Sequence, residues 1–104
     1  MPGVDFQTVR EQVSMADVLR LLHFERTSVR GDQRRGPCPV HGSQTKHSRS
    51  FSVNLQRGRY RCFVCGSRGN VIELWAAVRK MNLHGAAVEL CQSLGLEVPW
   101  IKRW

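Results

Sequence analysis

Two short motifs place metal-binding side chains at fixed intervals. Cys38 and His41 form a C-x2-H motif, and 20 residues later Cys62 and Cys65 form a C-x2-C motif. Each pair can bring two ligands to one shared ion from a tight turn. The segment between the pairs is long enough for a hairpin that brings them together. Three thiolates and one imidazole favour tetrahedral Zn²⁺. The spacing predicts one structural zinc ion whose four positions are all filled by protein, which leaves no open position for catalysis.

The remaining histidines and the fourth cysteine leave one alternative ligand. His47 lies six residues beyond His41 and is an alternative to it. His23 and His84 are expected on helices as surface or capping residues, and Cys91 in the core. The alternative to a metal site is a set of unligated core thiols. Structural zinc contributes roughly 10–16 kcal/mol, about the whole net stability of a small domain, so we expect the segment between the motifs to unfold without it.

The charge of the chain is concentrated around these motifs. The 104 residues carry 16 Lys+Arg against 8 Asp+Glu, and residues 26–68 hold ten of the bases with one acid, Asp32. Such an asymmetric basic patch favours a polyanionic partner, nucleic acid above all, although a solvated basic face is the alternative. The residues expected to contact DNA are the bases Arg34, Arg35, Lys46, Arg49, Arg57, Arg59, Arg61 and Arg68 and the rings of Tyr60 and Phe63.

The alternation of side chains indicates how these groups are presented. Residues 51–55 and 59–63 predict two strands joined by a turn at 56–58. In the second strand Arg59, Arg61 and Phe63 share one side, the preferred binding face, whereas Tyr60 shares the other side with a zinc ligand. Either ring could instead belong to the core. A hairpin alone is marginally stable, so residues 29–36 are a candidate third strand and the metal a second support.

Helical patterns flank this segment on both sides. Residues 5–24 are expected to be helical, with Ser14 and Asp17 as a capping pair. Residues 70–95 are also expected to be helical, with Asn70 as the N-terminal cap and Gly95 after the last helical residue. The tail, residues 96–104, has no predicted place. The fold class is therefore α+β: one domain over residues 1–104, a zinc ribbon with an antiparallel sheet over 26–68 between N-terminal and C-terminal helices.

The composition excludes some other classes of protein. The hydrophobic fraction of 41% is too high for a disordered tail. No apolar run reaches the ~18 residues of a membrane span, and the N-terminus lacks the pattern of a signal peptide. We expect a cytoplasmic protein, associated with the nucleoid and with no membrane contact.

Four segments together resemble the N-terminal CHC2-type zinc-binding domain of bacterial and phage DNA primases. They are Cys38-Pro39-Val40-His41, Ser50-Phe51-Ser52-Val53, Tyr60-Arg61-Cys62-Phe63-Val64-Cys65-Gly66 and Gly69-Asn70-Val71-Ile72, and the likeness covers residues 5–99. It implies a zinc ribbon that contacts single-stranded template DNA while a separate polymerase domain makes the RNA primer. The implied zinc ligands are Cys38, His41, Cys62 and Cys65, and the residues implied at the exposed sheet face are Ser50, Phe51, Tyr60, Arg61 and Phe63.

Two departures from the family pattern bear on function. Residues 42–49 are longer than the family's segment and lack its Thr-Pro, and the eight acids form no cluster that could hold catalytic Mg²⁺. No catalytic residue is therefore expected in this chain, and its partner would be a primase polymerase domain or another replication protein. The alternative function is a zinc-ribbon protein-interaction or regulatory module of a mobile element or phage.

Overall fold

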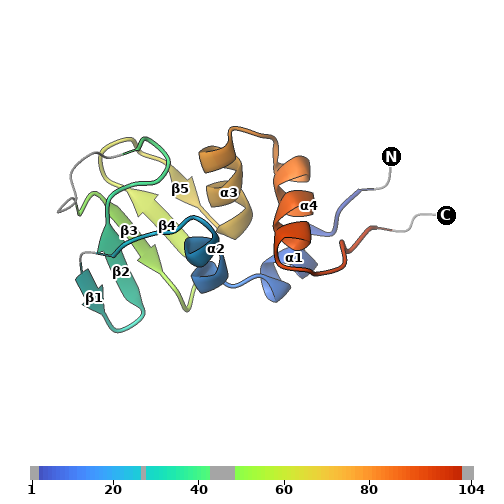
Figure 1. The fold of residues 1–104 in the computed structure, drawn as a ribbon, viewed down its shortest axis with the longest axis horizontal. Helices are drawn as coiled ribbons and strands as arrows, with labels where there is room; N and C mark the ends of the chain where they lie inside the picture. The colour runs from blue at the N-terminus through green and yellow to red at the C-terminus, as the bar shows by residue number, and fades with distance from the viewer. Residues whose placement is uncertain (1–2, 27, 43–48, 102–104) are drawn as a thin grey trace.

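The computed structural model describes residues 3–26, 28–42 and 49–101 and shows a sheet at one end of the molecule and helices at the other (Figure 1). The sheet is antiparallel, with its strands in chain order: β1 (Ser28–Arg30), β2 (Gln33–Gly36), β3 (Phe51–Asn54), β4 (Arg59–Cys62) and β5 (Arg68–Gly69). The helices are α1 (Phe6–Gln12), α2 (Met15–Leu21), α3 (Val71–Arg79) and α4 (Leu83–Ser93). This arrangement confirms the α+β class and the zinc-ribbon sheet.

The sheet has more strands than the sequence pattern predicts. The segment expected as one third strand, residues 29–36, is a hairpin of β1 and β2, which turns at Gly31 with a φ of 59°. Polar residues occupy both faces of this hairpin, so the alternation that reveals a half-buried strand is missing. Strand β5 has two residues, too few for any periodic pattern, and pairs with β4 beyond the C-x2-C motif.

The predicted N-terminal helical segment divides into two helices at Val13. Ser14 caps α2 by accepting a hydrogen bond from the Asp17 N–H at 3.1 Å, which confirms the predicted cap. Asp5 caps α1 through the Thr8 N–H, at 3.2 Å, and the Thr8 hydroxyl, at 2.8 Å. These bonds to Thr8 lower the pKa of the Asp5 carboxyl.

Helix α2 ends in a left-handed residue that is not glycine. The Phe24 N–H donates to the Leu19 carbonyl at 3.0 Å and the His23 N–H to the Arg20 carbonyl at 3.1 Å, which is the bonding of a Schellman motif. His23 has a φ of 54° and takes the place usually held by glycine. The motif turns the chain so that Phe24 packs against Phe51, with ring centroids 5.4 Å apart.

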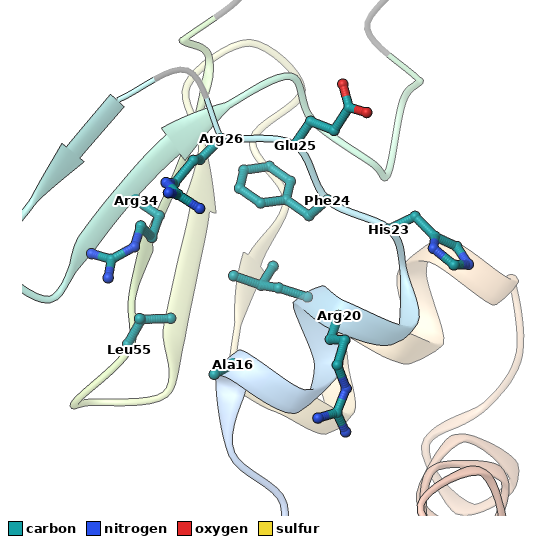
Figure 2. Close-up of a pocket in the computed structure, with 9 residues that line it drawn as sticks. Ala16, Arg20, His23, Phe24, Glu25, Arg26, Arg34 and Leu55 are labelled. Atoms are coloured by element: carbon teal, nitrogen blue, oxygen red, sulfur yellow. The ribbon is translucent and has the colours of Figure 1, made fainter.

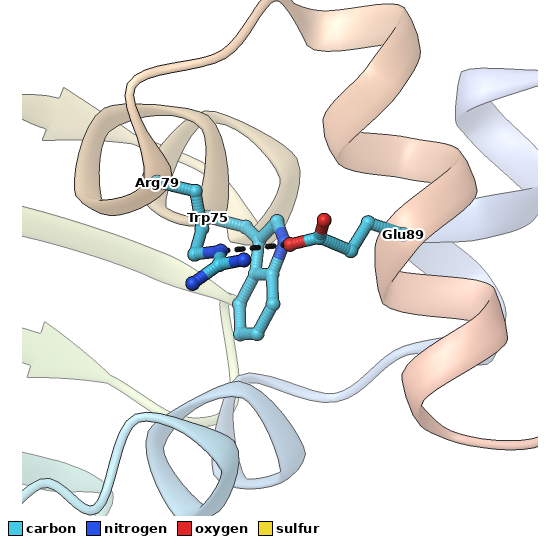
Figure 3. A network of polar contacts seen from close by, with 3 residues as sticks. All are labelled: Trp75, Arg79 and Glu89. Atoms are coloured by element: carbon cyan, nitrogen blue, oxygen red, sulfur yellow. Dashed lines mark hydrogen bonds and ion pairs between the residues drawn. The ribbon is translucent and has the colours of Figure 1, made fainter.

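The C-terminal helices begin and join as their polar residues dictate. Asn70 and Glu73 form a full capping box at the start of α3, with bonds of 3.0 and 3.1 Å. Figure 3 shows how α3 and α4 are linked: Glu89 Oε1 accepts from Trp75 Nε1 at 2.9 Å and from Arg79 Nε at 2.8 Å. Gly95, with a φ of 69°, follows α4 as predicted.

The core lies mainly between the helices and against one side of the sheet. Fully buried side chains come from every helix and from β3 and β4: Val9, Val13, Met15, Val18, Ile72, Leu74, Leu90, Cys91, Phe51, Val53 and Cys62. Helix α3 contacts β4 and β5 as well as the other three helices, so it joins the two ends of the molecule. None of the helices in the described residues is both long and apolar enough to cross a lipid bilayer.

The C-terminal tail pairs with the start of the chain. Val4 and Trp100 form an antiparallel bridge, and backbone hydrogen bonds of 2.8 Å from Asp5 to Pro99 and 2.7 Å from Ile101 to Gly3 flank it. This pairing joins residues almost a hundred positions apart, which explains why local sequence patterns gave the tail no place.

Candidate metal centre and basic sheet face

The two predicted ligand motifs meet at one end of the sheet. Cys38 follows β2 and Cys62 ends β4, and each begins a tight turn that returns the second ligand of its pair. In the second turn the Cys65 N–H donates to Cys62 Sγ at 3.4 Å and the Gly66 N–H to the Cys62 carbonyl at 3.0 Å. The ligand atoms of Cys38, His41, Cys62 and Cys65 all lie within 4.8 Å of one another.

The separations between these atoms match a tetrahedral zinc site. Bonds of about 2.3 Å to sulfur and about 2.0–2.1 Å to nitrogen place two tetrahedral sulfurs roughly 3.8 Å apart and a sulfur–nitrogen pair roughly 3.6 Å apart. Cys38 Sγ lies 3.9 Å from Cys65 Sγ, and Cys62 Sγ lies 3.6 Å from His41 Nδ1. These two separations are close to the tetrahedral values, and all four ligand atoms lie near enough to one another to hold one zinc ion.

Burial and hydrogen bonding act in opposite directions on the two buried thiols. Burial raises the pKa of Cys38 to about 12, so ionising this thiol without a counter-charge is costly. Burial also acts to raise the pKa of Cys62, but hydrogen bonds from the Cys65 and Val64 backbone outweigh it and lower the value to about 6. A divalent ion at this position offsets the cost of both thiolates.

Cys91, His23 and His84 stand apart from this cluster. Cys91 is fully buried in the core, as expected, and burial raises its pKa. His23 follows α2 and is exposed; His84 lies on α4, where its ring centroid is 6.0 Å from that of Trp100. His47, the alternative ligand, lies outside the described residues. Among the residues that the structure describes, Cys38, His41, Cys62 and Cys65 form the one cluster that could hold a zinc ion.

A row of polar side chains crosses the sheet on the face away from the core. The strand register places Arg35, Ser52, Arg61 and Arg68 directly opposite one another on β2, β3, β4 and β5. Phe63 follows this row at the end of β4 and is 56% exposed. We call these five residues the basic sheet face.

The ring of Phe63 is flanked by two of the arginines. The guanidinium carbons of Arg35 and Arg61 each lie 5.1 Å from the centre of the ring, within cation–π range. Arg35 also donates from Nε and Nη2 to the Arg49 carbonyl, at 3.1 and 2.6 Å, so its side chain is held in place. The result is an exposed aromatic ring with two guanidinium groups close to it.

Two aromatic residues expected at this face lie instead in the core. Phe51 is fully buried and Tyr60 is 4% exposed. Their rings stack with centroids 5.6 Å apart, and the Tyr60 hydroxyl forms a 2.7 Å hydrogen bond with the Ser67 hydroxyl. Burial raises the pKa of Tyr60. Neither ring is available to stack on a base. The expected placement of both rings at the exposed face was therefore wrong, and the alternative, that the Tyr60 ring lies in the core, is correct.

The predicted arginines are also divided between places. Arg34 is paired with Val53, whose side chain is buried, so Arg34 lies on the helix side of the sheet, away from the basic sheet face. Arg59 is exposed on the same side of β4 as Arg61, two residues before it, and Arg57 lies in the β3–β4 turn. Arg49 precedes β3 and is exposed, while Lys46 lies outside the described residues.

Sequence patterns missed two features of this face. Ser52 was not among the expected contacts, yet it lies in the middle of the row, where its hydroxyl accepts from Gln33 Nε2 at 2.9 Å. The alternation of residues 51–55 already placed the Ser52 side chain on the other side of the strand from the buried Phe51 and Val53. The flanking of Phe63 by Arg35 depends on strand register between β2, β3 and β4, which no local pattern supplies.

The site and sheet together define a zinc ribbon: four protein ligands close the end of a small antiparallel sheet. The model of the CHC2 zinc finger family matches residues 2–103, and the chain therefore belongs to that family.

Relatives and a solved structure agree with this assignment. The chain is 38% identical over 76 residues to the DNA primase of Treponema pallidum, covering 73% of this chain and 12% of that protein. It is 31% identical over 97 residues to the DNA primase of Lactococcus lactis, covering 92% and 15%. The crystal structure of the zinc-binding and RNA polymerase domains of Aquifex aeolicus primase matches 90% of this chain and 22% of its own, with a TM-score of 0.71 and 26% identity. The chain thus spans a small part of each protein it resembles.

Proposed function

We propose that this protein is the template-contacting module of a DNA primase and that its basic sheet face binds single-stranded DNA. The observation that carries the proposal is the exposed ring of Phe63 with the guanidinium groups of Arg35 and Arg61 close to it. Single-stranded nucleic acid is bound without strict sequence preference by aromatic rings that stack on bases beside cations that contact phosphates. The likeness to DNA primases supports the same function.

In this proposal the zinc ion has a positional role. It fixes the ends of β2 and β4, and so the relative position of Arg35 and of Arg61 with Phe63. Arg49, Arg59 and Arg68 extend the positive surface around this centre, and Arg57 and Lys46 remain predicted phosphate contacts. Tyr60 is left out because its ring is buried.

The proposal also covers partners and location. Residues 1–104 act as one module, in the cytoplasm and with the nucleoid, and RNA primers are made by a separate polymerase domain or by another replication protein. A primer-synthesis assay with nucleotides and Mg²⁺ tests the last point: we expect no product from this chain alone, and product would contradict it.

The DNA contact is tested by fluorescence anisotropy with a labelled single-stranded oligonucleotide. Stacking contributes about 1–3 kcal/mol per base, so Phe63→Ala should weaken binding by about five- to 150-fold. Arg61→Ala should weaken it less and lower the steepness of the salt dependence, because one phosphate contact is lost. Arg20→Ala, at an exposed arginine of α2 on the helix side of the sheet, is the matched control and should leave binding unchanged.

The controls decide between this proposal and the alternative. Each variant is first checked for bound zinc and for an unchanged amide spectrum. If wild-type protein binds no single strand at moderate salt, or if Arg20→Ala weakens binding as much as Arg61→Ala does, the proposal is wrong. The first result would favour a protein-interaction or regulatory module.

A further inference from the structure

A groove of about 460 Å³ lies on the helix side of the sheet, between α2 and the strands. Figure 2 shows it from close by, with α2 forming one wall and Arg34 and Leu55 on the other. Its floor is apolar and consists of Ala16, Leu19, Phe24 and Leu55. The β1–β2–β3 part of the sheet separates it from the basic sheet face, since Arg34 and Arg35 are consecutive residues of one strand and point to opposite sides.

Three arginines line this groove: Arg20, Arg26 and Arg34. Arg20 is paired with Asp17 at 3.3 Å. Arg34 donates to two carbonyls, those of Gly31 and Gln33, which leave its charge unneutralised. Within the described ranges, neither Arg26 nor Arg34 forms an ion pair with a carboxylate.

The arrangement of these charges favours an anion. Arg26 and Arg34 both line the groove, and in Figure 2 the carboxylate of Glu25 points away from their guanidinium groups. Two cations that line one groove repel each other, and a carboxylate bound there relieves that repulsion. The groove therefore joins an apolar floor to a concentrated positive rim.

The floor is suited to an aliphatic side chain rather than to a nucleic-acid base. Its one ring, Phe24, packs against Phe51 at an angle of 58° and lies close to Gly36, so only part of it faces the groove. The remaining floor residues are aliphatic. Val29, 50% exposed, lies on edge strand β1 opposite Arg34 and on the same side of the sheet, so it extends the apolar surface toward solvent.

We propose that this groove binds an acidic protein segment that carries an aliphatic anchor residue. Its carboxylates contact Arg26 and Arg34, and its anchor packs on Leu19, Phe24 and Leu55. This interaction surface is separate from the basic sheet face, so the protein can hold a partner protein and single-stranded DNA at the same time. The inference goes beyond the proposed DNA-binding function and does not depend on it.

The test uses a fluorescein-labelled peptide of repeating Asp-Asp-Leu units and the zinc-loaded protein of residues 1–104. Anisotropy measures its affinity, and amide chemical shifts in the ¹⁵N-labelled protein locate the contact. We expect shifts at Leu19, Phe24 and Arg34 and none at Arg61. The double variant Arg26→Glu, Arg34→Glu should weaken peptide binding at least about tenfold, and a peptide with serine in place of leucine should bind about as weakly.

The matched control is Arg61→Glu, which reverses one charge on the other face. It should leave peptide binding within about twofold while weakening binding of single-stranded DNA. Arg26→Gln with Arg34→Gln repeats the test with less disturbance of β2 should the double reversal fail to fold. Absence of saturable peptide binding at about 1 mM overturns the proposal. The proposal is also overturned if the peptide changes amide chemical shifts only at the basic sheet face, or if single-stranded DNA competes for the same groove.

Discussion

The ribbon and the helical end of this protein are held together by different means. The sheet contributes few large buried apolar side chains, chiefly Phe51, Val53 and Tyr60, and its last strand has two residues. The helices bury side chains from all four segments and add capping bonds at each start. A sheet this small with one apolar side depends on its metal, whereas the helices depend on packing. The exposed basic face is thus built on the metal-dependent end.

Removal of zinc should have the largest effect and should separate the two ends most clearly. Chelation, or Cys62→Ser, should collapse the amide dispersion of β2–β4, because the metal contributes roughly 10–16 kcal/mol. Part of the far-ultraviolet helix signal should remain. Cys91→Ser is the matched control, since this buried thiol lies outside the metal site, and it should keep both zinc and sheet. A zinc-free protein with an intact sheet spectrum would contradict the comparison.

A cavity in the helical end should destabilise the protein without loss of the metal. Leu90 on α4 is fully buried, and Leu90→Ala should lower the free energy of unfolding by about 2–5 kcal/mol. Urea denaturation measures this change, and metal analysis checks that zinc stays bound in the folded protein. Leu94→Ala, at a half-buried position near the end of the same helix, should cost less. Equal costs at both positions would mean that packing of α4 is not the cause.

The link between α3 and α4 should contribute a smaller amount. Glu89→Ala leaves Trp75 Nε1 and the Arg79 guanidinium without their shared acceptor, and should cost about 1–2 kcal/mol. Glu89→Gln keeps an acceptor oxygen and should cost less, because the Arg79 side chain is 55% exposed and its ion pair is screened by water. A larger loss for glutamine than for alanine would refute this account of the link.

The smallest expected effect is a gain at the end of α2. His23→Gly removes the strain of a left-handed backbone at a φ of 54°, but it also raises the conformational entropy of the unfolded chain. A net stabilisation of about 0.5 kcal/mol is therefore expected. His23→Ala keeps the strain and should give no gain. Thermal unfolding of the two variants side by side measures the difference, and a stabilising alanine would show that the backbone is not the cause.

Features encoded by neighbouring residues could be predicted from the sequence. The zinc ligands, the β3–β4 hairpin, and the caps at Ser14 and Asn70 depend on residues within a few positions of one another or on one alternating pattern. The burial of Cys91 followed from its place on an apolar helical stripe. The resemblance to a family added the ligand roles, and the matching family model bears it out.

Features set by strand register or by pairing between distant residues could not be predicted from the sequence. The side of the sheet on which Arg34 lies depends on its pairing with Val53, 19 positions away. Tyr60 and Phe63 are both aromatic residues of one predicted strand. Tyr60 is buried because it packs on Phe51, whereas Phe63 faces solvent, and these surroundings are not encoded locally. Basic residues close in sequence thus divide into two surfaces that composition treats as one.

The pairing of Val4 with Trp100 has a mechanical consequence. Residues 3–5 and 99–101 thus lie side by side at the helical end, away from the zinc site, in a molecule 51 Å long (Figure 1). A tag or neighbouring domain fused to either end would attach there and leave the ribbon uncovered. Tension applied between the two ends would first peel apart the short terminal pairing, one hydrogen bond after another, so the ribbon would bear load only after the terminal bridge had opened.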